Sequence, residues 1–207
     1  MNVKHQRPPK KRQLPPVRPL GTAGAWQTSD ARYRCYAREL FSELLSVVEA
    51  ISRDWPPGLS EGITSREQHP DLWDRCDHRD RLSDSVRVYA AMSIEGFLNF
   101  YGVYRLGQSV YERQFVNKPL FHKLQSLLHS CDGVQIEPTS DIAKTLQVVA
   151  RSRNALVHPS TQELTDGKPA IPPHVPGEAH AVMAAMEAFF AEFKRLVPEA
   201  AYVVDRG

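Results

Sequence analysis

Apolar residues recur every three or four positions over several long stretches of the chain, which is the spacing of one face of an α-helix. No stretch alternates clearly with the period of a β-strand, and no internal repeat is found. We therefore expect an all-α, up-and-down bundle of about five helices. The expected helices are 30–52, 80–104, 119–131, 141–158 and 178–197, with a shorter one at 108–115.

The stretch 141–158 carries a positive charge inside its apolar stripe. Arg153 follows Val149 by four residues and precedes Leu156 by three, so a helix turns all three toward one side. An Arg guanidinium stays charged, and burying it unpaired costs roughly several kcal/mol. We therefore expect Arg153 to be buried against a carboxylate or a polar ligand. The stripe consists of Ile142, Leu146, Val149, Ala150, Leu156 and Val157.

The stretch 80–104 is apolar on nearly all sides, which is typical of a helix deep in a bundle or at an oligomer contact. Glu95 is the acidic exception in its interior. Two opposite charges on apolar helices are expected to be each other's partner, so we expect Glu95 to pair with Arg153. The alternative is that the pair is structural and only fixes the register of the two helices.

The other face of 141–158 is cationic and rich in hydrogen-bonding groups. Pro159 should end this helix at or near His158. The imidazole then lies among unpaired carbonyls at the negative end of the helix dipole, which favours its protonated form. Asn154 is one turn earlier, close enough to hold the ring. The face consists of Lys144, Gln147, Arg151, Asn154 and His158.

Residues 1–29 differ in composition from the rest of the chain. They contain five prolines, six basic residues and no acidic residue. That leaves 20 basic against all 24 acidic residues for 30–207, a net charge near −4. We expect 1–29 to be a disordered basic tail and 30–207 to be one helical domain. Two interpretations of the tail stay open: attraction to nucleic acid or another polyanion, and a solvated tail without a partner.

The stretch 53–79 is predicted to be a long irregular insertion between the first and second helices. It holds several side chains that bind metals elsewhere, but not the paired ligands of a structural zinc site. We therefore expect no metal and an insertion that covers one edge of the bundle. The side chains in question are His69, Asp71, Asp74, Cys76, Asp77 and His78.

The three cysteines, Cys35, Cys76 and Cys131, are widely spaced and odd in number, so no disulfide framework is expected. The N-terminal residues do not include the apolar h-region of a secretion signal, and no uninterrupted apolar run reaches ~18 residues. We expect a cytoplasmic protein without a membrane span.

Two segments resemble HEPN domains, a superfamily of small α-helical nucleotide- and RNA-associated domains. Arg153-Asn154-Ala155-Leu156-Val157-His158 resembles the RNxxxH form of the family's RxxxxH motif. The segment AAMSIEGFLNFYG at 90–102 resembles the family's alanine-rich core helix with an interior acid, here Glu95. The resemblance covers about 82–196.

This resemblance implies a metal-independent endoribonuclease without a cofactor, whose site forms where the motifs of two protomers meet in a homodimer. His158 would act on the attacking ribose 2′-hydroxyl or on the leaving oxygen, and Arg153 would bind the scissile phosphate. Asn154 would orient the ring or the phosphate, and Glu95 would hold Arg153. Further RNA contacts would come from Lys144, Gln147 and Arg151. The expected ends are a 2′,3′-cyclic phosphate and a 5′-hydroxyl.

The resemblance also suggests biological roles and partners. A catalytic member would be a toxin or an antiviral-defence effector, with RNA as substrate and an antitoxin or nucleotidyltransferase-like protein as partner. Some family toxins carry a modifiable Tyr two residues after the His, whereas this chain has Ser160. The alternative is a non-catalytic HEPN-like module that binds RNA, a nucleotide or a partner protein.

Overall fold

The computed structural model describes residues 16–19, 28–55, 67–157 and 177–205. All regular structure in these ranges is helical, which confirms the all-α prediction. No helix in the described part of the chain has both the length and the apolar composition needed to cross a bilayer. The elements are α1 (Asp30–Arg53), α2 (Pro70–Leu106), α3 (Gln108–Gln114), α4 (Leu120–Asp132), α5 (Asp141–Val157), α6 (Gly177–Leu196), the 3₁₀ helix η1 (Pro198–Ala200) and α7 (Ala201–Val204).

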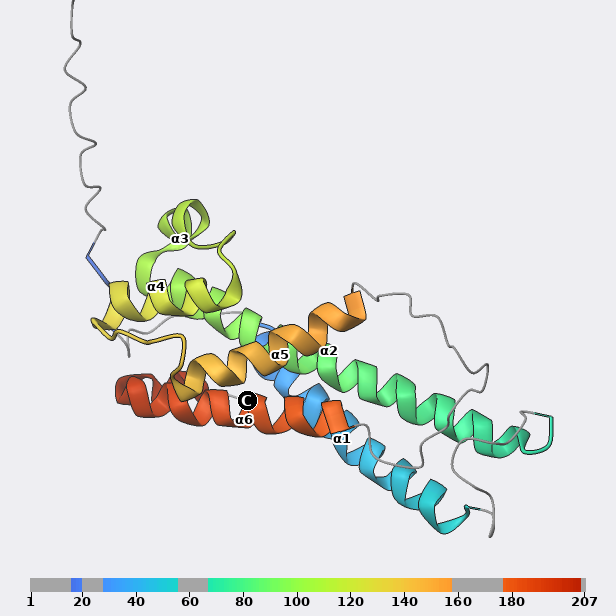
Figure 1. The fold of residues 1–207 in the computed structure, drawn as a ribbon. Coiled ribbons are helices and arrows are strands. Elements are labelled where there is room, and N and C mark those ends of the chain that lie inside the picture. Colours follow the sequence, from blue (N-terminus) through green and yellow to red (C-terminus); the bar gives the residue numbers. More distant parts are fainter. Residues whose placement is uncertain (1–15, 20–27, 56–66, 158–176, 206–207) are drawn as a thin grey trace, which may run out of the picture.

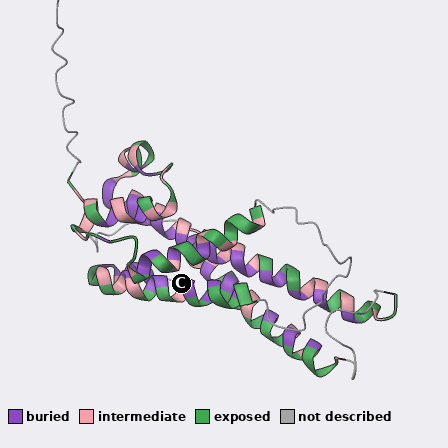
Figure 2. Ribbon diagram, viewed as in Figure 1, coloured by how far each residue is buried: buried purple, intermediate pink, exposed green. Residues whose placement is uncertain are grey.

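Helix α2 is the longest of these elements, with 37 residues, and it contacts α1, α3, α4, α5 and α6. In Figure 1, α1 lies along the N-terminal half of α2, while α4 lies near its C-terminal end. Figure 2 shows buried residues along almost the whole of α2. The nearly all-round apolar pattern of 80–104 follows from this position, because α2 is covered from several sides.

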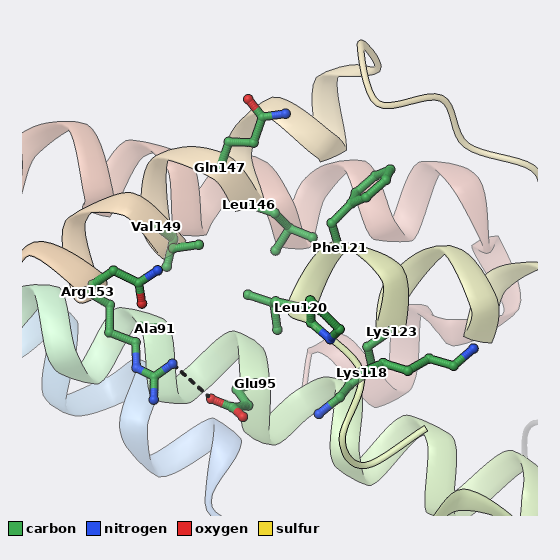
Figure 3. A pocket seen from close by; sticks show the side chains of 13 residues that line it. Ala91, Glu95, Lys118, Leu120, Phe121, Lys123, Leu146, Gln147, Val149 and Arg153 are labelled. Carbon is green, nitrogen blue, oxygen red and sulfur yellow. Dashed lines mark ion pairs between the residues drawn. The ribbon is translucent and has the colours of Figure 1, made fainter. Parts of the chain in front are cut away.

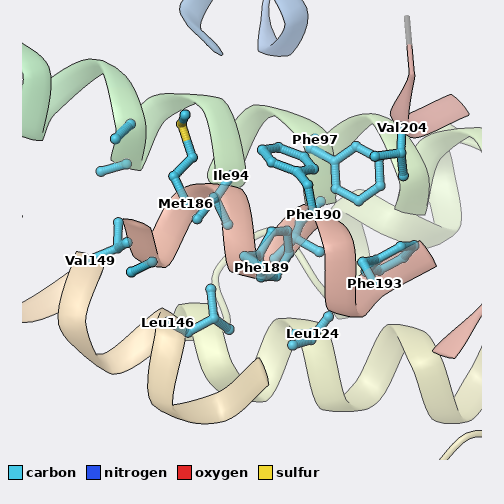
Figure 4. Packing of buried hydrophobic residues seen from close by; sticks show 14 of the residues in the cluster. Ile94, Phe97, Leu124, Leu146, Val149, Met186, Phe189, Phe190, Phe193 and Val204 are labelled. Atoms are coloured by element: carbon cyan, nitrogen blue, oxygen red, sulfur yellow. The ribbon is translucent and has the colours of Figure 1, made fainter. Parts of the chain in front are cut away.

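Aromatic side chains fill the centre of the core. Phe97 of α2 packs edge-on against Phe190 and Phe193 of α6, with ring centroids 5.4 Å and 4.8 Å apart (Figure 4). Edge-to-face pairs of this kind add about 0.5–1.5 kcal/mol each beyond the burial of their area. Leu146 and Val149 bring the first half of α5 onto the same core (Figure 4).

The prediction that 53–79 is an irregular insertion is wrong from residue 70 onward. Helix α2 begins at Pro70 and not at Asp80, and the part of the predicted insertion at 56–66 lies outside the described residues. Proline suits the first turn of a helix, where its missing N–H has no partner anyway. The apolar positions Leu72 and Cys76 are four residues apart and pack with Ile51 of α1 in a second, smaller cluster. The many charged neighbours in this stretch obscured its helical spacing.

The tail prediction is only partly open to test, because 1–15 and 20–27 lie outside the described residues. The backbone N–H of Arg18 donates to the carbonyl of Arg105 at 2.8 Å, and Val17 packs against the main core. These four residues, 16–19, therefore lie on the helical body. The sequence prediction also missed η1 and α7, which bury Val203 and Val204.

A buried ion pair joins the end of α2 to the end of α4. Arg105 Nη1 lies 2.6 Å from Asp132 Oδ1, and the two side chains are 8% and 9% exposed. Tyr101 donates to the other carboxylate oxygen of Asp132 at 2.7 Å. A second guanidinium nitrogen of Arg105 donates to the carbonyl of Cys131 at 2.7 Å. The buried charge is thus matched by charge and by hydrogen bonds, as burial requires.

Replacing Asp132 by Asn tests how much this ion pair contributes to the stability of the fold. The variant leaves the guanidinium of Arg105 buried without its counter-charge, so the free energy of unfolding should fall by about 3 kcal/mol. Urea unfolding followed by circular dichroism measures the change. Lys194→Gln is the control, because it breaks an exposed pair with Asp205 and should cost less than about 1 kcal/mol. Equal losses in the two variants would contradict the assignment.

Candidate functional site

A pocket of about 390 Å³ opens between α2, α4 and α5 (Figure 3). Apolar side chains from all three helices form part of its wall. Its polar lining consists of Glu95, Lys118, Lys123, Gln147, Arg153 and Asn154. Four of these six residues are candidates from the sequence, so the fold brings Glu95, Gln147, Arg153 and Asn154 to one place.

Arg153 and Glu95 face each other at this pocket, as Figure 3 shows. Arg153 Nη1 lies 4.0 Å from Glu95 Oε2, which confirms the predicted pairing. The distance is that of a loose ion pair and exceeds hydrogen-bond length. Arg153 can therefore turn to another anion without breaking a direct hydrogen bond to Glu95.

The prediction that Arg153 is buried is wrong. Its side chain is 49% exposed, and that of Glu95 is 42% exposed. Within α5, burial ends at Val149, and none of the positions 150–157 is buried. The last turns of α5 are largely exposed in Figure 2. The apolar stripe continues past the point where other helices cover it, and Val157 is 54% exposed. Periodicity identifies the face of a helix but not where its cover ends.

The sequence prediction missed Lys123, which is the most enclosed charge of the pocket. Its side chain belongs to α4 and the residue is only 2% exposed. The amine donates a hydrogen bond to Asn99 Oδ1 at 2.9 Å. Burial lowers the pKa of Lys123, while the negative charge of Glu95 opposes that shift. The cation thus depends on a neutral amide and a nearby carboxylate.

A signal for Lys123 was present in the sequence. It follows Leu120 by three residues and precedes Leu127 by four, so it lies on the apolar face of α4. Leu127 is fully buried. A charged residue on an apolar helix face is also the pattern that identified Arg153 on α5. Unlike Arg153, Lys123 is buried.

Tyr111 shares a hydrogen-bond acceptor with Lys123, although it is not part of the pocket lining. Its hydroxyl donates to the same amide oxygen, Asn99 Oδ1. Burial and the charge of Glu95 raise the pKa of Tyr111 to about 12, so it is neutral at physiological pH. Its ring fits against α2 because the facing residue is Gly102, where a Cβ atom would collide with the ring.

The residues of the predicted RNA-binding face of α5 do not all lie at the pocket. Gln147 and Asn154 line the pocket, whereas Lys144 and Arg151 are exposed and are not part of its lining. Lys144 forms an ion pair with Asp141 at 3.0 Å. His158 lies outside the described residues, so its position relative to Arg153 stays a prediction.

Arg87 of α2 holds the turn of α5 that carries the candidate residues. Its guanidinium donates to the hydroxyl of Ser152 at 2.6 Å and to the carbonyl of Ser152 at 2.9 Å. It also lies 2.7 Å from Glu178 Oε2 in the first turn of α6 and 3.1 Å from Asp84 Oδ1. Arg153 follows directly after this fixed residue.

The charges of the pocket favour an anion. Lys118, Lys123 and Arg153 bring three positive charges against the one negative charge of Glu95. The carboxamides of Gln147 and Asn154 can donate further hydrogen bonds. Within the described residues, no group of three or more His, Cys, Asp or Glu could hold a metal ion.

Comparison of the chain with family models, curated proteins and solved structures found no match. The chemistry of the site therefore rests on its residues and their geometry.

Replacing Glu95 by Gln tests the electrostatic coupling in the pocket. A negative charge favours the protonated forms of both Lys123 and Tyr111, so its removal should lower both pKa values. Titration of the labelled side chains by ¹³C NMR measures both shifts. Glu192→Gln, which removes an acid paired with Arg195, should change neither pKa. Unchanged values in Glu95→Gln would contradict the coupling.

Proposed function

We propose that the protein is a metal-independent endoribonuclease of the HEPN type, with its helices arranged as a HEPN-like bundle. The observation that carries the proposal is the setting of Arg153. Its half-exposed guanidinium lies at a cationic pocket, 4.0 Å from Glu95, on the same helix as Asn154 and five residues before His158. An accessible, loosely held guanidinium is suited to binding a phosphate.

The proposed reaction is transesterification within the RNA strand. The ribose 2′-oxygen attacks the phosphorus, and the bond from phosphorus to the 5′-oxygen breaks. One His158 accepts the proton of the 2′-hydroxyl, and the partner's His158 gives a proton to the leaving 5′-oxygen. The products are a 2′,3′-cyclic phosphate and a 5′-hydroxyl. Arg153 stabilises the charge that develops on the non-bridging phosphate oxygens, and Glu95 orients Arg153.

A second copy of the chain is the proposed partner in the site. The last turns of α5 are uncovered in one protomer, and Val157 exposes 54% of its surface one turn after Arg153. Met92 on α2 is also exposed. Apolar surface beside a catalytic candidate supports a dimer that would cover it. Lys144 and Arg151 would then extend the RNA contact along the outer face of α5.

A toxin or antiviral-defence effector is the role we propose for such a nuclease, with an antitoxin or nucleotidyltransferase-like protein as its inhibitor. The second candidate function is a non-catalytic module that binds RNA, a nucleotide or a partner protein. The favouring observation is that Lys118, Lys123 and the two carboxamides line one pocket, and such groups bind anions without a histidine.

Cleavage of labelled RNA by wild type, Arg153→Ala and His158→Ala tests the proposal. Loss of the general acid–base should reduce the cleavage rate by about 10²–10⁴-fold, and loss of the guanidinium by about 10²–10³-fold. A substrate with a 2′-deoxy sugar at the cleaved position should stay intact, because it lacks the nucleophile.

Arg195→Ala is the matched control, since it removes an exposed arginine of α6 that pairs with Glu192. It should cleave as wild type does. Circular dichroism and light scattering check that each variant folds and keeps its oligomeric state. If the wild type binds RNA but leaves a broad panel uncut, the binding module is the correct function.

A further inference from the structure

Lys123 differs from Arg79, Arg87 and Arg105, three other buried cations in the described part of the chain, in what it contacts. Arg87 and Arg105 each form direct ion pairs with carboxylates at 2.6–3.1 Å. The ammonium of Lys123 has three N–H donors, and its hydrogen bond goes to the neutral Asn99 Oδ1. A buried charge of this kind is costly without a counter-charge in contact with it. The pocket beside it offers the place for such a counter-charge.

The start of α4 adds to the positive potential of the same pocket. Pro119, Leu120 and Phe121 line it, and α4 begins at Leu120. The first N–H groups of a helix have no acceptor within the helix, and they carry the positive end of its dipole. No side chain caps this end, and its first turn contains no acidic residue. Helix starts in this condition bind phosphate groups.

The size and walls of the pocket suit a phosphate with organic groups attached. Its volume of about 390 Å³ lies within the range of small-ligand sites. Phe121 of α4 and Leu146 of α5 both contribute apolar lining (Figure 3). Arg153 lies at the same pocket, so a ligand there would be next to the proposed site of cleavage.

We propose that this pocket is a phosphate subsite, in which Lys123 and the start of α4 bind the phosphate that neighbours the scissile one in an RNA strand. The assignment of RNA as the source rests on the proposed function. Lys118 and Gln147 line the same pocket; the Lys118 amine also donates to Ser126 Oγ at 2.7 Å, and the Gln147 amide donates to the Pro138 carbonyl at 3.5 Å. Glu95 opposes the bound phosphate, because its carboxylate carries the same sign of charge. The charge of Glu95 raises the pKa of Lys123 and so supports its protonated form.

Binding measurements in the His158→Ala background test the subsite, because this background prevents cleavage. Lys123→Met keeps the length of the side chain and removes its charge. It should weaken binding of a fluorescent oligoribonucleotide by about 10–100-fold, the loss of one charged hydrogen bond. Glu95→Gln should tighten binding by about tenfold, because it removes a like charge from a partly enclosed site. Lys194→Gln, an exposed lysine of α6, is the control and should bind as the background does.

A measurement on the unsubstituted Lys123 keeps the test independent of how the variants fold. ¹³C NMR of the lysine side chain follows Lys123 during titration with inorganic phosphate, adenosine 5′-monophosphate and the oligoribonucleotide. A shift of the Lys123 signal with all three, and tightest binding of the oligoribonucleotide, supports an RNA phosphate. Equal affinity for the mononucleotide supports the phosphate subsite with a free nucleotide as its source.

The proposal is overturned if no titrant moves the Lys123 signal, or if Lys123→Met binds all three as tightly as the background. Neither readout depends on catalysis. RNA cleavage by wild type without any response of Lys123 would reject the subsite and leave the proposed nuclease in place. A response of Lys123 in a protein that cuts no RNA would keep the phosphate subsite and reject the proposed nuclease.

Discussion

Buried positive charge fixes how the shorter helices are arranged around α2. An arginine keeps its proton at any physiological pH, so each buried guanidinium needs an acceptor at a defined place. Arg105 finds it in Asp132 of α4, and Arg87 finds it in Ser152 of α5 and Glu178 of α6. A helix that slid by one turn along α2 would leave a guanidinium among apolar side chains. The apolar core supplies most of the stability, and these contacts select one docking of the helices.

Much of this fold follows from spacing alone, because a helix that packs on one side repeats its apolar residues every three or four positions. The predicted limits 30–52 and 108–115 lie within one residue of α1 and α3. The start of α2 was missed because its first ten residues contain only a few apolar positions, such as Leu72 and Cys76. Leu72 and Cys76 matter because they pack against Ile51 of α1. No local pattern in the sequence reveals such a contact between two helices.

The sequence predicted which two charged residues of the candidate site pair, but not how exposed their side chains are. Glu95 and Arg153 are charged residues on apolar faces, and electrostatics alone predicts that they pair. Whether the pair is buried depends on how far along α5 the other helices cover it. That is a property of the assembled fold. Lys123 is likewise a charged residue on the apolar face of α4. Its hydrogen bond to Asn99, an acceptor shared with Tyr111, forms only through the packing of α2, α3 and α4.

The contacts of Arg87 have a consequence for the chain on either side of residues 158–176. Ser152 precedes this segment and Glu178 follows it, and one guanidinium holds both. The helices on the two sides of the segment, α5 and α6, are therefore held to α2 by the same side chain. Closing a longer connection costs only about 0.6 kcal/mol for each doubling of its length. Changes of length or sequence between residues 158 and 176 should therefore leave α5 and α6 in their places on α2.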